Sequence, residues 1–279
     1  MSRRTTVNVA LVAALTAGAL FAVDQLALQA QAPAQVPDFS GVYYPIAGGG
    51  GRAGGAAAPR GGGANAAAPA ARGRGPLPAP TRAAPTSDGS AGRAPDAAKL
   101  TPEYMAKWEV IRKSRMSGSY EYDNTANCLP PGMPGMMAMA YGMEVMQSKD
   151  RITFFSELND ALRRVYLDGR KPTPAILDDP TYAGYSTGRW EGDTLVVETV
   201  ALNDATFIEG FSPHSDEMTI TERIRLVEPT LLEDQITVRD PKALLEPWSI
   251  TRRYRKASPP NDQLREFACA EGLKREGHK

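Results

Sequence analysis

The chain has 279 residues, and its 32 basic and 32 acidic side chains give a formal net charge of zero. Balanced charge gives no reason to expect nucleic acid or an acidic membrane surface as a partner. Two cysteines far apart and two histidines are too few for the common zinc sites, so we expect neither a metal nor a cofactor.

The first residues have the pattern of an export signal. Arg3 and Arg4 precede an uncharged apolar run over residues 7–23, and small residues follow. We predict a signal peptide over residues 1–30, a periplasmic or secreted protein, and no membrane span after cleavage. A retained membrane anchor is the alternative, although the run is slightly short for a full span.

Residues 31–45 contain a short first strand, DFSGVYY, and then the composition changes abruptly. Residues 46–97 are almost entirely Gly, Ala, Pro and Arg. Such a segment buries too little apolar surface to offset its conformational entropy, so we predict a disordered insertion. Its arginines among glycines also fit a nucleic-acid-binding segment, but a flexible insertion is the simpler interpretation.

We place the folded domain at residues 98–272 and a polar tail at 273–279. Thr101-Pro102-Glu103 is a good helix start, and Tyr104, Trp108 and Ile111 then form one apolar stripe. This pattern predicts a helix over residues 101–116.

The remainder of the domain is rich in strands joined by short turns. GYSTGRWEGDTLVVETV, residues 184–200, indicates a β-hairpin turning at Glu191-Gly192-Asp193. Besides the first strand, the expected strands cover 143–148, 151–157, 161–167, 183–190, 194–200, 217–227, 231–239, 247–255 and 263–269. We predict an all-β fold, an antiparallel meander that closes as a lipocalin-like barrel, with a sandwich as the alternative and one N-terminal helix.

The segment CLPPGMPGMMAMAYGMEVMQ begins at Cys128 and has too many prolines and glycines for regular structure up to about residue 141. Its methionines suit either an irregular core or, as an alternative, a Cu(I) site. In an oxidising compartment Cys128 and Cys269 predict one disulfide, with two free thiols as the alternative.

Three charged residues interrupt apolar strand faces when the strands are read with a period of two. They are Glu222, Asp234 and Arg252. Across the turn at Glu228-Pro229-Thr230, Ile224 should lie opposite Asp234, and Asp234 in turn opposite Arg252. The pair is either a buried structural ion pair or the polar floor of a pocket.

The same reasoning applies to the strand over residues 161–167. With a turn at Asn159-Asp160, Arg164 should lie beside Phe154 and Tyr166 beside Ile152. An inward arginine with a tyrosine hydroxyl would hold a carboxylate or phenolate ligand. The alternative is an arginine that extends to the edge of the sheet.

His214 lies in a long, partly apolar loop over residues 201–217 and is a candidate general base together with Glu222. The alternative is a histidine that only shapes the loop. Arg189 and Trp190 either cap a pocket or staple their hairpin, and we favour the staple.

Several motifs together resemble a family of uncharacterised exported bacterial proteins. They are the FSGVY strand at 39–43, CLPPGMP at 128–134, the end of a strand at 163–170, GRWEGDTLVV at 188–197, PHSD at 213–216 and the Glu222-Arg223 pair. Tyr43 replaces the usual tryptophan, and the Gly/Ala-rich insertion is peculiar to this chain. The resemblance implies an exported β-rich domain and no particular reaction.

Three functions remain in view. The leading one is binding of a small apolar or aromatic molecule, with or without a carboxylate, in a barrel pocket with Arg164, Tyr166 and Glu222 as its polar contacts. Asp234, Arg252, Arg189 and Trp190 are further candidate ligand-binding residues. The second is a cofactor-independent lyase, isomerase or hydrolase that uses His214 and Glu222. The third is an envelope interaction protein with a filled barrel.

Overall fold

The computed structural model describes residues 36–46, 96–138 and 140–269. The chain divides into two units, Met1–Pro37 and Asp38–Lys279, and everything below concerns the second. The expected signal peptide, nearly all of the insertion and the polar tail lie outside the described residues. Within the described ranges, no helix is long and apolar enough to cross a membrane.

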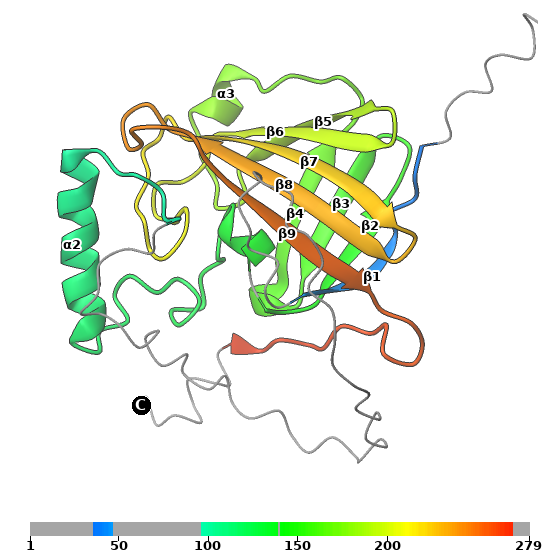
Figure 1. Ribbon diagram of the computed structural model, residues 1–279, viewed down its shortest axis with the longest axis horizontal. Helices are drawn as coiled ribbons and strands as arrows, with labels where there is room; N and C mark the ends of the chain where they lie inside the picture. Colours follow the sequence, from blue (N-terminus) through cyan, green and yellow to red (C-terminus); the bar gives the residue numbers. More distant parts are fainter. Residues whose placement is uncertain (1–35, 47–95, 139, 270–279) are drawn as a thin grey trace, which may run out of the picture. The chain divides into compact units, whose positions relative to one another are not determined.

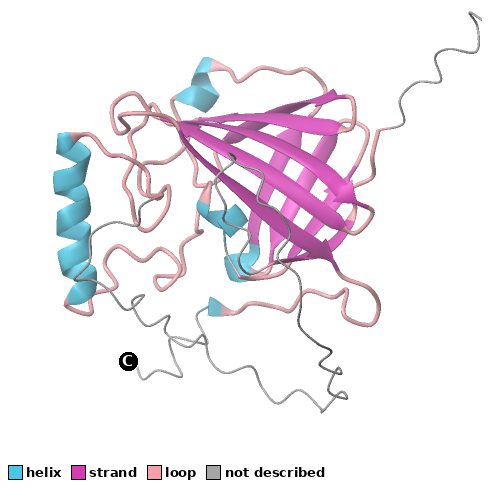
Figure 2. Ribbon diagram, in the orientation of Figure 1, coloured by secondary structure: helices cyan, strands magenta, loops and turns pink. Residues whose placement is uncertain are grey.

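Nine strands form a closed barrel in which every strand pairs with its neighbours in chain order (Figures 1 and 2). The predicted barrel is confirmed, and the alternative of a sandwich is wrong. The strands are β1 Gly41–Pro45, β2 Met143–Gln147, β3 Arg151–Ser156, β4 Ala161–Tyr166, β5 Tyr185–Glu191, β6 Thr194–Val200, β7 Thr219–Glu228, β8 Leu231–Arg239 and β9 Trp248–Lys256.

The meander is not wholly antiparallel, because β4 and β5 pair in parallel at Val165–Ser186 and Tyr166–Thr187. An antiparallel ring needs an even number of strands, so nine strands require one parallel pair. The connection over residues 167–184, with the short helix α3 (Pro174–Leu177), carries the chain back to the end of the barrel where β4 began. The predicted tenth strand, 263–269, is wrong: residues 263–268 form a loop.

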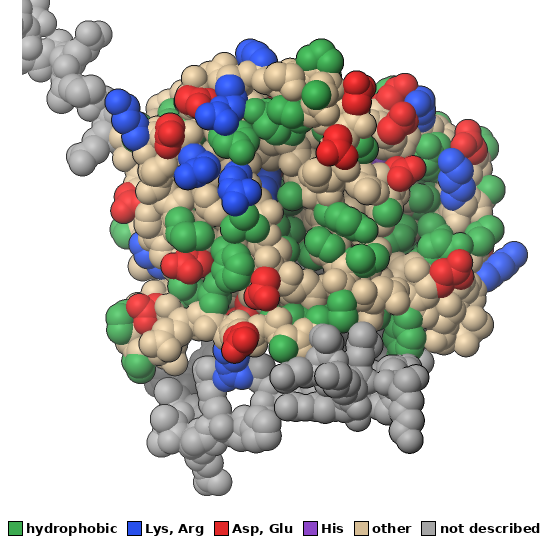
Figure 3. Space-filling view, turned by 180° about the vertical axis from the view of Figure 1, so that it is seen from behind, with side chains coloured by type: hydrophobic (Ala, Val, Ile, Leu, Met, Phe, Trp, Pro, Cys, Tyr) green, Lys and Arg blue, Asp and Glu red, His purple; other side chains and the backbone are tan. Residues whose placement is uncertain are grey.

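Inward and outward side chains alternate along the strands, as expected for a barrel. In β7, Ile220, Glu222 and Ile224 are buried, whereas Arg223 and Arg225 are exposed. One space-filled face shows acidic and basic side chains interspersed with apolar ones (Figure 3). Glu222 therefore belongs to the buried, inner set of β7.

The helix α2 (Pro102–Met116) packs against the loop that follows β6. The indole Nε1 of Trp108 donates a hydrogen bond to the carbonyl of Gly210 at 3.3 Å. The guanidinium carbon of Arg115 lies 3.2 Å from the centre of the Phe211 ring. The helix thus stabilises the loop after β6.

Residues 131–138, which we call the plug, pack against the core of the barrel, and all of them except Gly135 and Ala138 are buried. Met133, Met136 and Met137 belong to the main core, and η1 (Gly135–Ala138) forms the last turn of the plug. The hydroxyl of Tyr254 in β9 donates to the carbonyl of Met137. Methionine suits this irregular packing because its side chain is flexible and unbranched.

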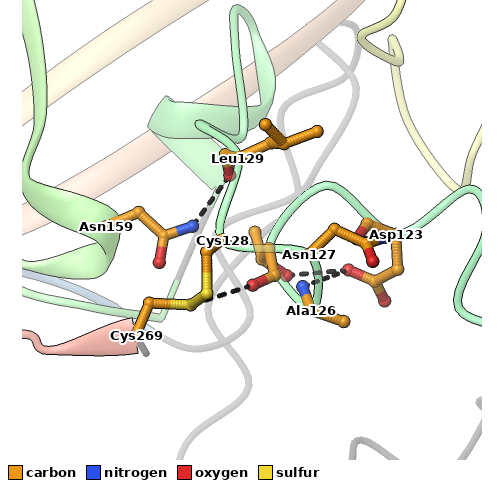
Figure 4. The surroundings of a disulfide bond; sticks show 8 residues. Asp123, Ala126, Asn127, Cys128, Leu129, Asn159 and Cys269 are labelled. Carbon is orange, nitrogen blue, oxygen red and sulfur yellow. Dashed lines mark hydrogen bonds between the residues drawn. A yellow bond between two sulfur atoms is a disulfide. The ribbon is translucent and has the colours of Figure 1, made fainter. Parts of the chain in front are cut away.

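The predicted disulfide joins Cys128 to Cys269, with 5.6 Å between the two Cα atoms (Figure 4). The alternative of two free thiols is wrong. Close by, the side-chain amide of Asn159 donates to the carbonyl of Leu129 at 2.8 Å. The disulfide therefore ties the start of the segment that contains the plug to the chain that follows β9.

Candidate functional site

The centre of the barrel contains a buried arginine that the sequence analysis did not single out. Arg163 in β4 is 1% exposed, and its side chain crosses the interior to reach three other strands. Its Nε donates to Ser186 Oγ at 3.1 Å, and one terminal nitrogen donates to Thr199 Oγ1 at 3.0 Å. Both terminal nitrogens also donate to the carboxylate of Glu222, one of them at 2.8 Å.

This ion pair is well satisfied. Both Glu222 oxygens accept from Arg163, and the hydroxyls of Ser186 and Thr199 lie 2.8 Å apart. A bidentate arginine–carboxylate pair is among the strongest charge-assisted arrangements. Glu222, which we expected as a catalytic residue, is therefore held by a structural partner.

Arg164 and Tyr166 do not point into the barrel, so that expectation is wrong. Phe154 pairs with Arg163 and Ile152 with Val165, one residue away from the predicted register. Four residues, 157–160, connect β3 to β4, and the 3-10 turn η2 (Leu158–Asp160) lies among them. Because the register shifts by one, every side chain of β4 changes face.

Arg164 is consequently exposed on the outer wall. Tyr166 is also on the outside, where its ring lies 5.4 Å from that of Tyr185 and 4.1 Å from the guanidinium carbon of Arg170. Neither residue is placed to hold a ligand inside the barrel.

Asp234 in β8 is fully buried, and neither of its carboxyl oxygens accepts a hydrogen bond from the described residues. Burial raises the pKa of Asp234 well above its ordinary value, and the nearby charge of Glu222 and a hydrogen bond from the protonated acid to Glu222 raise it further. Arg163 and Arg252 oppose this shift only in part. The environment thus favours the neutral acid, which can donate a hydrogen bond.

Asp234 pairs with Arg252 across β8 and β9, and with Ile224 across β7 and β8, in the predicted register. The expected ion pair is nevertheless absent from the described residues. The Nε of Arg252 is buried without a hydrogen-bond partner. A neutral Asp234 attracts the guanidinium only weakly, because the charged form that would pair with it is disfavoured by burial.

His214 is 3% exposed and has both ring nitrogens engaged. Nδ1 donates to the carbonyl of Ser215 at 2.8 Å, so in the neutral ring Nε2 accepts from the Thr206 hydroxyl at 2.7 Å. Burial is the main cause that lowers the pKa of His214. Ser215 Oγ donates to Asp240 at 2.8 Å and not to the histidine. These hydrogen bonds hold the loop together and leave no ring nitrogen of His214 free to act as a general base.

Arg189 and Trp190 separate onto opposite faces of β5. Arg189 is exposed and bonds to Glu191 and Glu198, each at 3.0 Å, as a staple of the hairpin. Trp190 packs against the core, with its ring 5.2 Å from that of Phe39. Trp190 therefore helps to fill the barrel near the β5–β6 turn.

Sequence reasoning missed Arg163, Ser186 and Thr199. Ser186 and Thr199 are small polar residues on otherwise apolar inward faces, and they are direct partners across β5 and β6. Two small hydroxyls at facing inward positions are the signal that could have indicated a buried charge between them. Within the described ranges, no group of His, Cys, Asp and Glu is arranged to hold a metal ion.

Comparisons with known proteins add the following. No protein-family model matches the chain, and no curated protein matches it. Among solved structures, the chain is similar to the crystal structure of a mutant of the fluorescent protein UnaG, with 14% identity and a TM-score of 0.27. That likeness covers 49% of this chain and 88% of the other. A likeness of this size carries no argument about function, which has to come from the site itself.

Proposed function

We propose that this is an exported protein that binds a small apolar or aromatic molecule inside the barrel, with Asp234 and Arg252 as its polar contacts. One observation carries the proposal. These two residues face the interior from neighbouring strands, the buried Nε of Arg252 has no hydrogen-bond partner among the described residues, and the Asp234 carboxyl accepts no hydrogen bond from them.

Unpaired polar groups inside a protein are uncommon, since leaving one unsatisfied costs about 1–3 kcal/mol. The neighbouring ion pair is satisfied, because Arg163 bonds to Ser186, Thr199 and Glu222. A bound molecule that supplies the missing partners would remove the cost at Asp234 and Arg252.

The surroundings of the two residues suit an apolar molecule. Ile224, Ile236 and Ile250 flank them on the inward faces of β7, β8 and β9, and all three belong to or pack against the main core. Ligand sites commonly combine such apolar walls with a few polar groups that fix the orientation of the ligand.

The disulfide supports export. Such bonds persist in oxidising compartments and are rare in the cytosol. Cys128 and Cys269 are separated by 141 residues, so their pairing constrains most of the folded domain.

Native mass spectrometry tests the proposal. The protein is expressed with its N-terminal segment, recovered from the periplasm and incubated with an extract of the culture. We expect a retained small molecule that is lost in Asp234→Leu and kept in Arg164→Met, which changes an exposed arginine of β4. A bare protein mass under all conditions contradicts the proposal and favours an envelope interaction protein.

A further inference from the structure

We propose that the barrel wall opens between β4 and β5, a junction we call the seam, and that the side chain of Arg163 holds the seam closed. The opening is the path by which the molecule of the proposed function reaches the interior, so this part of the inference rests on that function. Two observations carry it: the short pairing of the two strands, and the hydrogen bonds that Arg163 makes across the seam.

The seam is the shortest strand pairing among the described residues. β4 and β5 pair only at Val165–Ser186 and Tyr166–Thr187, whereas β5 and β6 pair all along Tyr185–Glu191. Parallel pairs are also slightly less stable per residue than antiparallel ones. Little backbone hydrogen bonding therefore has to break for the seam to part.

The next shortest pairings, those of β1, are extended by other hydrogen bonds. Beyond its ladder with β9, the N–H of Ala257 donates to the carbonyl of Val42 at 2.7 Å. Beyond its ladder with β2, the N–H of Phe39 donates to the side chain of Gln147 at 3.0 Å. Within the described ranges, no backbone hydrogen bond outside the ladder joins β4 to β5. The seam is therefore the weakest junction in the backbone of the wall.

The chain next to the seam adds single hydrogen bonds from outside the sheet. Just before β4, the side-chain amide of Asn159 donates to the carbonyl of Leu129 at 2.8 Å (Figure 4). Just before β5, the carbonyl of Tyr182 accepts from the N–H of Met133 at 2.9 Å. Neither bond joins β4 to β5 directly.

Arg163 supplies on the inside what the backbone lacks. It starts on β4 and bonds to Ser186 on β5, Thr199 on β6 and Glu222 on β7. Parting the seam separates β4 from β5, so these bonds have to break together. The bonds to Glu222 are charge-assisted and bidentate, which makes them the strongest of the set. One side chain therefore holds the seam closed.

Hydration offsets part of the cost of opening. Arg163 and Glu222 are both fully buried, and removing two charges from water is expensive. When the seam parts, water reaches both charges again. Long ladders join β7 to β8 and β8 to β9, so that side of the barrel can stay intact while the seam opens.

Hydrogen exchange, followed by mass spectrometry of proteolytic fragments, tests the role of Arg163 without any ligand. In Arg163→Met combined with Glu222→Leu, we expect the segments 161–166 and 185–191 to exchange at least tenfold faster than in the native protein. The segment 231–239 of β8 should stay within twofold, and Arg164→Met should leave all three segments unchanged. Unchanged exchange in β4 and β5, or an equal increase in β8, overturns the inference.

Reaction of buried thiols tests the path. Val165 at the seam and Val238 in β8 are both fully buried, so Val165→Cys and Val238→Cys place matched thiols at the two positions. Methyl methanethiosulfonate is the small apolar probe, and circular dichroism establishes that both variants are folded. We expect the Val165→Cys thiol to react at least tenfold faster than the Val238→Cys thiol. Equal rates, or a faster reaction at Val238→Cys, overturn the path.

The proposed function and the opening can fail separately. Both experiments use the protein without ligand. Native mass spectrometry that finds no bound molecule therefore contradicts the proposed function alone, and equal thiol reactivity contradicts the opening alone.

Discussion

Arg163 and Glu222 meet inside the barrel from β4 and β7, and neither side chain is exposed to solvent. Two hydroxyls, of Ser186 and Thr199, complete the hydrogen bonding of the arginine. Burying two charges is costly, and the cost is recovered only when the geometry is good and the remaining donors are satisfied. This pair meets both conditions, so its stability depends on both partners being present.

Removing one partner should destabilise the protein strongly. We expect Arg163→Met or Glu222→Leu alone to lower the free energy of unfolding by about 3–5 kcal/mol, because each leaves an uncompensated buried charge. Urea denaturation, followed by tryptophan fluorescence, measures the change.

The double variant is the informative comparison. Arg163→Met combined with Glu222→Leu should recover most of the loss, since neither charge of the pair is left without its partner and Ser186 and Thr199 still bond to each other. Arg164→Met, on the outer face, should stay within about 0.5 kcal/mol of the native protein. If the double variant is as unstable as the sum of the single ones, the two residues do not act as a pair.

Some strand pairings around the site could be predicted from the sequence and others could not, and the turns between the strands decide which. The register of β7, β8 and β9 follows from their alternating patterns, so the pairing of Asp234 with Arg252 is confirmed. A bulge between Leu226 and Glu228 did not disturb it, because the irregularity lies at the end of the hairpin.

The register of the β3–β4 hairpin was predicted wrongly, by one residue. Arg163 and Arg164 are adjacent, so either could face inward, and only the length of the turn decides between them. Asn159 and Asp160 have φ values of 53° and 48°, in the left-handed region. These two residue types tolerate this conformation, but their presence alone does not predict it. The one inward charge that matters most was therefore assigned to the wrong residue.

The parallel pairing of β4 and β5 could have been predicted from the length of the connection between them. The 18-residue connection over residues 167–184 is too long for a hairpin and long enough for a crossover. Counting residues 263–269 as a strand gave ten strands, an even number that would close without a parallel pair. The disulfide at Cys269, rather than a strand ladder, holds that segment.

The difference in stability between the native protein and Asp234→Asn should depend on pH in a defined way. The folded-state pKa of Asp234 is raised, so the native protein binds its proton over a range where the unfolded chain has released it. The native protein therefore loses stability as the pH rises above the unfolded value, about 3.9, and continues to lose it until the folded pKa is passed. The asparagine variant has no such term.

Denaturation of the native protein and of Asp234→Asn between pH 4 and pH 8 tests this pH dependence. We expect the free energy of unfolding of Asp234→Asn to gain on that of the native protein as the pH rises, by about 1.4 kcal/mol for each unit by which the pKa is shifted. A constant difference across this range would contradict the raised pKa of Asp234.

His214 should give the opposite dependence. Its folded-state pKa is lowered by burial, so the unfolded chain takes up a proton at a higher pH than the native protein does. The stability contributed by the neutral ring is full above the unfolded value, about 6.5, and is lost as the pH falls toward the folded pKa. His214→Gln should be less stable at pH 8 and should close the gap toward pH 5, as followed by thermal denaturation. A gap that widens on acidification would be inconsistent with a buried neutral histidine.

Gly132, in the plug, should tolerate no side chain. Its φ is +69°, and an added Cβ would lie 2.2 Å from Cγ2 of Thr206. We expect Gly132→Ala to cost about 2–4 kcal/mol from the strained backbone and the overlap together. Gly169 has a φ of +77° and open space around it, so Gly169→Ala isolates the backbone part, about 1 kcal/mol.

A second change separates overlap from strain at Gly132. Thr206→Ser removes the overlapping methyl group and keeps the hydroxyl that bonds to His214. Gly132→Ala should therefore cost less in the Thr206→Ser background than in the native one, as measured by a double-mutant cycle in urea. Equal costs in the two backgrounds would show that the Thr206 methyl group does not contribute to the overlap at Gly132.

The disulfide should contribute mainly by restricting the unfolded chain. Cys128 and Cys269 are 141 residues apart, and closing a loop of that length corresponds to about 5 kcal/mol on the chain-entropy treatment. The double variant Cys128→Ala with Cys269→Ala should lower the free energy of unfolding toward that amount. It should also increase the dependence of that free energy on urea, because the unfolded chain becomes more expanded. A loss below about 1 kcal/mol, with an unchanged urea dependence, would mean that the unfolded chain is already compact between the two cysteines.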